Sequence, residues 1–261
     1  MDRFEVTNRE YKEFVDSGGY HRPEFWQHPF VLDDDTLSFE QAKEFFTDAT
    51  GCPGPSTWIA GDYPGGHDDY PVSGISWYEA AAYAQFKGKE LPTFWHWRSA
   101  AGHMNEIFRD NIGSSQIPLS NMGGEDPEPV GLNPGISPFG AFDMAGNVRE
   151  WCWNRSPEDR AISGGAWNDV SYMATNRNYM PAFDRSARNG FRCAVYPHKE
   201  KMDSSIFQPV PLWGTHRDYN SEEPVSEMEF RIYKKQFLYD RTELNSQIED
   251  RDESPEDWVV E

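Results

Sequence analysis

The stretch Gly140-Ala-Phe-Asp-Met-Ala-Gly-Asn-Val-Arg-Glu-Trp151 decides the fold of this chain. Two more blocks follow it in order, Ile162-Ser-Gly-Gly-Ala-Trp167 and Asn189-Gly-Phe-Arg-Cys193. Glycine next to aromatic and β-branched residues is typical of short strands that lie close to neighbouring backbone. These blocks therefore predict short β-type segments at residues 148–153, 161–167 and 190–196.

Four helix starts precede these blocks. In three of them a Thr or Ser is followed three positions later by Glu or Gln, which is the pattern of a capping box: each of the two side chains accepts a backbone N–H of the other residue. Gly18-Gly19 and Gly88 predict where the first and third helices end. The expected caps are Thr7, Ser38, Ser76 and Thr93.

Between Gly102 and Gly140 the residues Gly, Pro, Asn and Asp recur every few positions, without a sustained period of 2 or 3.6. This pattern predicts long ordered loops. Helices that are followed by loops and short strands indicate a mixed α+β fold. The second helix is expected to turn its apolar residues Ala42, Phe45 and Phe46 inward.

Composition excludes several classes of protein. Ten tryptophans and 15% aromatic residues are too many for a disordered chain. The chain has no run of about eighteen apolar residues and no apolar segment of the signal-peptide type near residue 1. We therefore expect no membrane insertion, and the compartment stays open. A net charge of −20 argues against nucleic acid as a partner; it is explained either by solubility or by affinity for divalent cations and basic surfaces.

The chain has three cysteines, Cys52, Cys152 and Cys193. Three cysteines do not make a disulfide framework. Cys152 and Cys193 each follow an aromatic-rich block and can meet in space. The alternative is a pair of buried free thiols, which behave as small apolar residues.

Together with Glu5-Val-Thr-Asn8 and Pro71-Val-Ser-Gly-Ile-Ser-Trp77, the three blocks resemble the formylglycine-generating enzyme, or sulfatase-modifying factor, family over about residues 1–197. The resemblance implies a C-type-lectin-like fold with long irregular loops and few short strands, within the α+β class. The family has catalytic and non-catalytic members. Its catalytic cysteines therefore decide which kind of domain this chain is.

Active members of the family hold copper with a pair of cysteines that follows the Gly-Gly-aromatic block, because soft thiolates suit Cu(I). The matching positions in this chain are Asp169 and Ala174. Neither residue supplies a thiolate, and no other cysteine lies between Trp167 and Cys193. We therefore assign no catalytic residue and expect no copper.

The resemblance also implies a calcium ion at the turn before the Asn-Val-Arg-Glu-Trp segment. Position by position, its ligands are the side chains of Asp143 and Glu150 and the carbonyls of Gly146 and Val148. Four oxygen ligands on a bent loop suit a hard cation. The alternative is that both carboxylates only accept hydrogen bonds from N–H groups of the turn.

The segment from residue 168 to 188, called the 168–188 loop below, is the expected ligand-binding surface because family members bind their substrates there. A polar composition is also what any solvent-facing loop shows. The ligand itself, whether a peptide, a protein or a small polar molecule, stays open. The candidate residues are Asn168, Asp169, Arg177, Asp184, Arg185 and Arg188.

Residues 198–261 are expected to form a helical extension and an acidic linker toward a missing domain. Ser226 begins a helix with Phe230, Tyr233 and Phe237 on one face. Seven carboxylates from residue 249 to 261 are typical of a solvated linker. The tail resembles the segment that joins such a domain to an α/β-hydrolase in bacterial multidomain proteins that begin with a serine/threonine kinase domain. Family members also carry an opening Gly-rich strand, so we expect this chain to be a fragment.

The sequence therefore predicts a non-catalytic ligand- or protein-binding module of a larger bacterial protein. One alternative is an oxidoreductase of the formylglycine-generating type with altered chemistry, or the regulatory part of a kinase or hydrolase. A second alternative is a lectin-like receptor with a variable binding loop. The chain itself contains neither the Gly-x-Ser-x-Gly motif of hydrolases nor a kinase Gly-rich loop.

Overall fold

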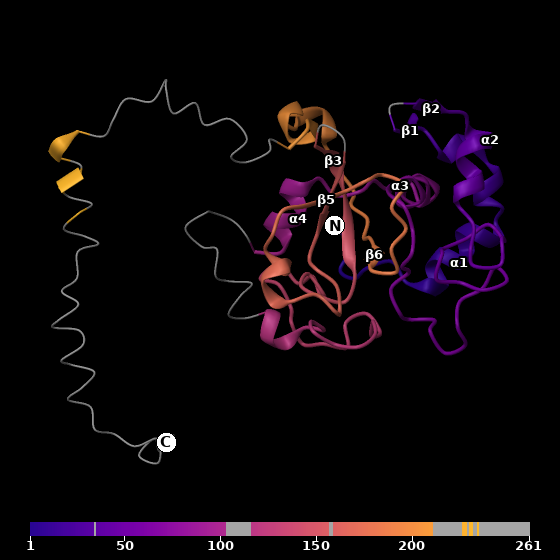
Figure 1. Cartoon of the computed structure of the whole chain (residues 1–261), viewed down its shortest axis with the longest axis horizontal. Helices are drawn as coiled ribbons and strands as arrows, with labels where there is room; N and C mark the ends of the chain where they lie inside the picture. Colours follow the sequence, from indigo (N-terminus) through magenta and orange to yellow (C-terminus); the bar gives the residue numbers. More distant parts are fainter. Residues whose placement is uncertain are drawn as a thin grey trace, which may run out of the picture. The chain divides into compact units, whose positions relative to one another are not determined.

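The computed structural model describes residues 1–33, 35–102, 116–156 and 159–210, together with 226–228, 230–231 and 234. The chain divides into two units, Met1–Leu212 and Trp213–Glu261. No helix within these described ranges is long and apolar enough to cross a membrane. The fold of the first unit, which contains the candidate site, is mixed helix and sheet (Figure 1).

Hydroxyl caps begin each of the four α-helices in the described part of residues 1–102, as the sequence predicts. Thr7 Oγ1 accepts from the backbone N–H of Glu10, and Glu10 Oε2 accepts from the N–H of Thr7 at 2.9 Å. Ser38 and Ser76 form the same reciprocal bonds, and Thr93 accepts from the N–H of His96. The helices are α1 (Asn8–Asp16), α2 (Phe39–Ala42), α3 (Trp77–Phe86) and α4 (Phe94–Ala100).

The second helix is shorter than expected, and one inward residue was predicted wrongly. After Ala42 the backbone tightens into the 3-10 helix η3 (Lys43–Phe45). Three residues per turn instead of 3.6 rotate Phe45 away from the core, so its side chain is 46% exposed. Phe46 is buried and stacks on Trp26 with 4.9 Å between the ring centroids.

The main sheet has the strand order β5-β4-β3-β6. Its central strands β3 (Arg149–Arg155) and β4 (Arg160–Ser163) are antiparallel and overlap the predicted segments 148–153 and 161–167, whereas β6 (Asn189–Gly190) shares only Gly190 with the third. Strand β6 pairs parallel with β3, with Arg149 opposite Asn189. A Cβ at Gly190 would lie 2.6 Å from the carbonyl oxygen of Val72, so only glycine fits there. The remaining strand is β5 (Asn178–Met180).

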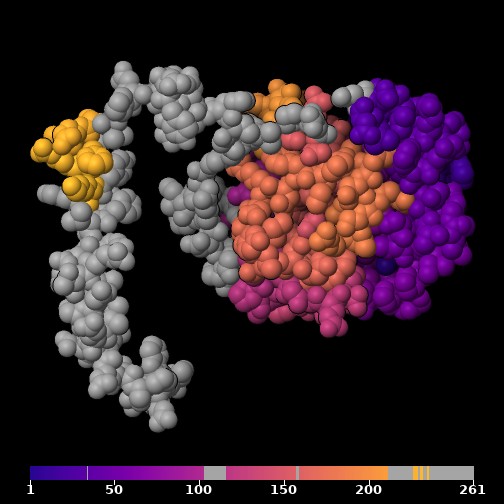
Figure 2. Space-filling model, in the orientation of Figure 1, coloured from indigo at the N-terminus to yellow at the C-terminus, as the bar shows by residue number. Residues whose placement is uncertain are grey.

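A two-stranded hairpin, β1 (Phe30–Leu32) and β2 (Asp35–Leu37), was not predicted. It lies with α1 and α2 in the N-terminal part of the domain, drawn in indigo and purple in Figures 1 and 2. Helix α3 contacts both α1 and β3. It therefore joins this helical part to the sheet, and one aromatic core, which includes Tyr11, Phe14 and Trp77, spans the two.

The segment after residue 197 packs on the domain up to the end of the described range. Val210 is buried, and its N–H donates to the carbonyl of Arg155 at 2.8 Å. The side-chain amide of Asn154 donates to the carbonyls of Ile206 and Gln208. Residues 198–210 are therefore part of the compact unit, beyond the boundary that the sequence suggests. The acidic run, Tyr233 and Phe237 lie outside the described residues.

Candidate functional site

The 168–188 loop leaves β4 through two glycines with positive φ angles. Gly164 has φ +96° and Gly165 has φ +74°, values that favour glycine. A Cβ at Gly165 would lie 2.8 Å from Cε of Met122. The loop then forms a 3-10 turn, η6 (Ser171–Ala174), before β5. The close packing of Gly164 and Gly165 thus fixes the path of the backbone between β4 and the segment that contains Asp169 and Ala174.

Asp169 lies in a buried ion pair that ties the loop to β3. Arg149 donates to it through two atoms, Nε to Oδ2 at 2.8 Å and Nη2 to Oδ1 at 2.7 Å. The backbone N–H of Ala166 also donates to Oδ2, at 2.9 Å. The side chains of Arg149 and Asp169 are only 5% and 7% exposed. Bidentate pairs of this kind fix geometry as well as adding binding energy.

Ala174 is buried beneath α4, in the apolar cluster that contains Phe94 and Trp97. The two cysteines nearest to the sheet, Cys152 and Cys193, are free and fully buried. Burial raises the pKa of both thiols far above the ordinary value, so neither forms a thiolate at neutral pH. The residues at the two copper positions therefore do not fit Cu(I), which requires soft thiolates there.

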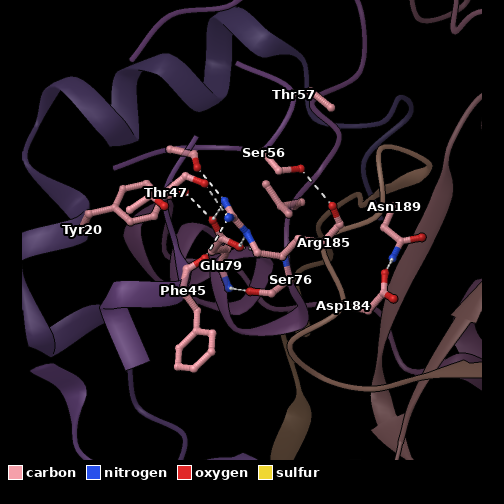
Figure 3. A network of polar contacts seen from close by, with 12 residues as sticks. Tyr20, Phe45, Thr47, Ser56, Thr57, Ser76, Glu79, Asp184, Arg185 and Asn189 are labelled. Atoms are coloured by element: carbon pink, nitrogen blue, oxygen red, sulfur yellow. Dashed lines mark hydrogen bonds and ion pairs between the residues drawn. The ribbon is translucent and has the colours of Figure 1, made fainter. Parts of the chain in front are cut away.

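Arg185 was expected to face a ligand, but the structure places it in the interior (Figure 3). Its side chain is 12% exposed and pairs with the fully buried carboxylate of Glu79 at 2.8 Å. The same guanidinium donates to the carbonyls of Phe45, Thr47 and Gly54. Glu79 also accepts from Tyr20 at 2.7 Å. Arg185 thus holds the end of the loop against the helical part of the domain.

Of the other candidate residues, some contact neighbouring residues of the fold and others are exposed to solvent. Asp184 accepts from the side-chain amide of Asn189 at 2.7 Å and from the N–H of Ser186 at 2.9 Å, so it shapes the turn. Arg177 lies over the rings of Phe94 and Trp95. Asn168 is exposed. The side chain of Arg188 is 37% exposed and reaches Asp169 at 3.5 Å.

Two apolar residues of the loop are exposed and were missed by sequence reasoning. Val170 is 54% exposed and Tyr172 is 64% exposed, and Asn168, which is close in the sequence, is exposed as well. A contiguous exposed apolar patch marks an interaction surface, and these two residues are the candidates for one on this loop. No local signal separates them from Met173, Ala174 and Phe183, which are apolar residues of the same loop that are not exposed.

Glu150, an expected calcium ligand, already has strong partners. Arg192 donates to both of its oxygens, at 2.6 and 2.7 Å, and the indole N–H of Trp97 donates at 2.8 Å. Glu150 and Arg192 are both fully buried. Asp143 has φ +55° and accepts from the N–H of Gly131 at 2.6 Å. Asp143 thus accepts a backbone N–H, as in the alternative, whereas the partners of Glu150 are side-chain donors and not N–H groups of the turn.

The same region nevertheless holds more buried carboxyl groups than cations. Glu5, Asp143 and Glu150 are each at most 2% exposed, and Arg192 is the cation among them. Burial, with the charges of Glu150 and Glu128, raises the pKa of Asp143 to about 6. Burial, with the charges of Asp143 and Glu150, also raises the pKa of Glu5. A divalent cation would offset this charge.

No three Asp, Glu, His or Cys side chains in the described part of the chain form a group that could hold a metal. The expected calcium set does not require three, because two of its four ligands are carbonyls. The carboxylates of this set suit a hard cation. To bind calcium, however, Glu150 would have to share its oxygens with Arg192 and Trp97. Calcium binding therefore stays a prediction.

We expect calcium to raise the melting temperature relative to a chelator at pH 7.5, where Asp143 is ionised and buried. A ligand of the native state at a hundredfold excess over its Kd stabilises by about 2.7 kcal/mol. Asp143→Asn should raise stability in chelator, because it removes a buried charge, and should abolish the calcium effect. Asp126→Asn, at an exposed position, is the matched control. Identical wild-type melting curves in calcium and chelator would rule out the site.

The mixed helix and sheet fold agrees with the comparison of the chain with known protein families. The family model described as the sulfatase-modifying factor enzyme 1-like domain matches residues 1–197. The chain belongs to this family. The match covers the capped helices, the main sheet and the whole 168–188 loop, so the ion pair of Asp169 lies inside the family domain.

Three relatives show how varied the proteins with this domain are. Hercynine oxygenase of Mycolicibacterium smegmatis is 31% identical over 210 residues, which cover 74% of this chain and 44% of that protein. Serine/threonine-protein kinase pkn1 of Chlamydia caviae is 27% identical, with 74% and 32% covered. Inactive C-alpha-formylglycine-generating enzyme 2 of Bos taurus is 27% identical, with 74% and 76% covered. The chain thus spans less than half the length of the first two.

Proposed function

We propose that this sulfatase-modifying-factor domain is a non-catalytic module that binds a ligand or a protein through its 168–188 loop. The observation on which this rests is Asp169. A carboxylate in a buried bidentate pair with Arg149 stands where the copper mechanism needs a thiolate, and buried Ala174 stands at the second position. The loop is fixed at its start by Asp169 and near its end by Arg185, while Asn168, Val170 and Tyr172 face solvent.

Two relatives support this proposal. One is named an inactive formylglycine-generating enzyme, and the match covers three quarters of it. Another is a serine/threonine-protein kinase of which the match covers 32%. In a multidomain protein of that kind, a domain with a fixed loop binds the ligand or partner on which the attached domains act. The long irregular segments around the small sheet support a C-type-lectin-like fold for this module.

A titration with Cu(I) in the presence of a competing chelator tests the loss of catalysis. We expect no stoichiometric copper binding above that of a variant without the three cysteines, because no two thiols are available at the loop. One equivalent of copper bound in competition with the chelator would favour the alternative, a formylglycine-generating-type oxidoreductase with altered chemistry.

A lectin-like receptor with a variable loop is the second candidate function, and the exposure of Val170 and Tyr172 favours it. A screen of immobilised glycans and peptides should yield a ligand whose binding is weakened about tenfold by Tyr172→Ser, since well-packed aromatic contacts dominate binding energy. Ile59→Ser, at an equally exposed position (65%) outside the loop, is the control. Ligands that bind both variants as tightly as wild type would contradict a role for the loop.

A further inference from the structure

Asp169 is shared by two guanidinium groups, and this leaves one positive charge without a partner. Arg149 forms the bidentate pair, and Arg188 Nη1 lies 3.5 Å from Asp169 Oδ1. No other carboxylate in the described part of the chain lies within 4.0 Å of either guanidinium. Two cations and one anion therefore meet at the base of the loop, in a chain whose net charge is −20.

One donor of this group is buried and unused. The Nη1 atom of Arg149 has no hydrogen-bond partner, although the side chain is only 5% exposed. A buried donor without an acceptor is costly, and in native proteins such a donor usually meets a ligand or a water. Opposite Arg149 on strand β6, the Oδ1 atom of buried Asn189 likewise lacks a donor.

Arg188, the second guanidinium of this group, is only weakly held. Its side chain is 37% exposed, and its two side-chain contacts, to Ser186 Oγ and Asp169 Oδ1, are both 3.5 Å long. Contacts at this limit are weak. The guanidinium can therefore turn toward an anion without breaking a strong hydrogen bond. Arginine is also the side chain best suited to a planar carboxylate.

We propose that Arg149 and Arg188, bridged by Asp169, recognise a carboxylate group of an amino acid or peptide. The carboxylate accepts from Arg149 Nη1 and Arg188, and an N–H group next to it, as amino acids and peptides carry, donates to Asn189 Oδ1. This inference rests on the proposed binding function of the 168–188 loop and specifies the chemical class of its ligand.

The test is a titration of the full chain followed by NMR of the arginine side-chain N–H groups. The probes are sodium glutamate, an acetylated and amidated Gly-Asp-Gly peptide and its Gly-Asn-Gly counterpart, each against sodium chloride at equal ionic strength. We expect shifts at Arg149 and Arg188 with either carboxylate probe but not with the Asn peptide. The two carboxylate arms distinguish a free amino acid from an acidic peptide as the better source.

Two variants give effects of opposite sign. Arg188→Gln should weaken binding of the carboxylate about tenfold, the effect of losing one charge-assisted hydrogen bond, whereas Arg22→Gln, at another half-exposed ion pair, should not. Asp169→Asn should tighten binding, because both guanidiniums lose their shared carboxylate. A purely structural role for the cluster would not produce this gain. If Asp169→Asn does not fold, Arg188→Gln remains decisive.

Shifts that do not exceed those of sodium chloride, or unchanged affinity in Arg188→Gln, would overturn the carboxylate site. A loop-dependent ligand that binds wild type and Arg188→Gln equally would also overturn it, and would leave the proposed binding function standing. Oxidation of a substrate cysteine by the domain would overturn the binding function and is measured separately from the titration.

Discussion

Replacement of Arg192 by Met is expected to lower the free energy of unfolding by about 3–5 kcal/mol, the cost of leaving a buried charge unpaired. Arg192 is fully buried and holds both oxygens of Glu150. It also donates to the carbonyls of Arg3 and Phe142. Without it, the carboxylates of Glu5, Asp143 and Glu150 share one interior with no arginine among them.

Urea unfolding followed by tryptophan fluorescence measures this loss. The matched control is Arg9→Met, which breaks an exposed ion pair with Asp69 in which both side chains are more than half exposed. Exposed pairs contribute about 0–1 kcal/mol, so we expect a small change in the control. A loss below about 1 kcal/mol in Arg192→Met would contradict the central role that we give to this buried pair.

The second large effect is expected for Arg185→Met, which should also cost about 3–5 kcal/mol. The substitution leaves Glu79, whose side chain is fully buried, with the hydroxyl of Tyr20 but no cation. It also removes donors from three backbone carbonyls in the helical part (Figure 3). Because Arg185 joins the loop to that part, hydrogen exchange in the 168–188 loop should accelerate along with the loss of stability.

Hydrogen exchange by mass spectrometry with Lys12→Met as a control separates this effect from general instability. Lys12 pairs with Asp16 on the exposed side of α1, far along the chain from the loop. We expect no change in loop exchange for the control. If Arg185→Met left both the stability and the loop exchange unchanged, Arg185 would not anchor the loop, and its sequence-based assignment to a ligand surface would regain support.

Local rules explain why part of this fold was predictable. The capping boxes at Thr7, Ser38 and Ser76 depend on residues three positions apart, so the sequence shows them directly. The glycine-rich blocks likewise mark β3 and β4, because Gly146 before β3 and Gly165 after β4 lie where a Cβ would clash with neighbouring atoms. Phe45 was misplaced because the change from α- to 3-10 geometry depends on tertiary packing, which the apolar pattern does not report.

Long-range partners explain why most of the site was not predictable. The sequence identifies Asp169 as a missing cysteine, but its ion pair with Arg149 joins residues 20 positions apart. Arg185 and Glu79 are 106 positions apart, and nothing local marks that arginine as buried. The composition of the loop therefore does not separate exposed residues, such as Asn168, from residues that hold the loop in place.

The central claim is that the domain binds through its loop and has no formylglycine-generating chemistry. Incubation of the chain with copper, oxygen and a Cys-x-Pro-x-Arg peptide, followed by mass spectrometry of the peptide, tests it most directly. The buried ion pair at Asp169 and the methyl group of Ala174 predict an unchanged peptide thiol, equal to the control without protein. Conversion of the cysteine to an aldehyde above that control would contradict the account.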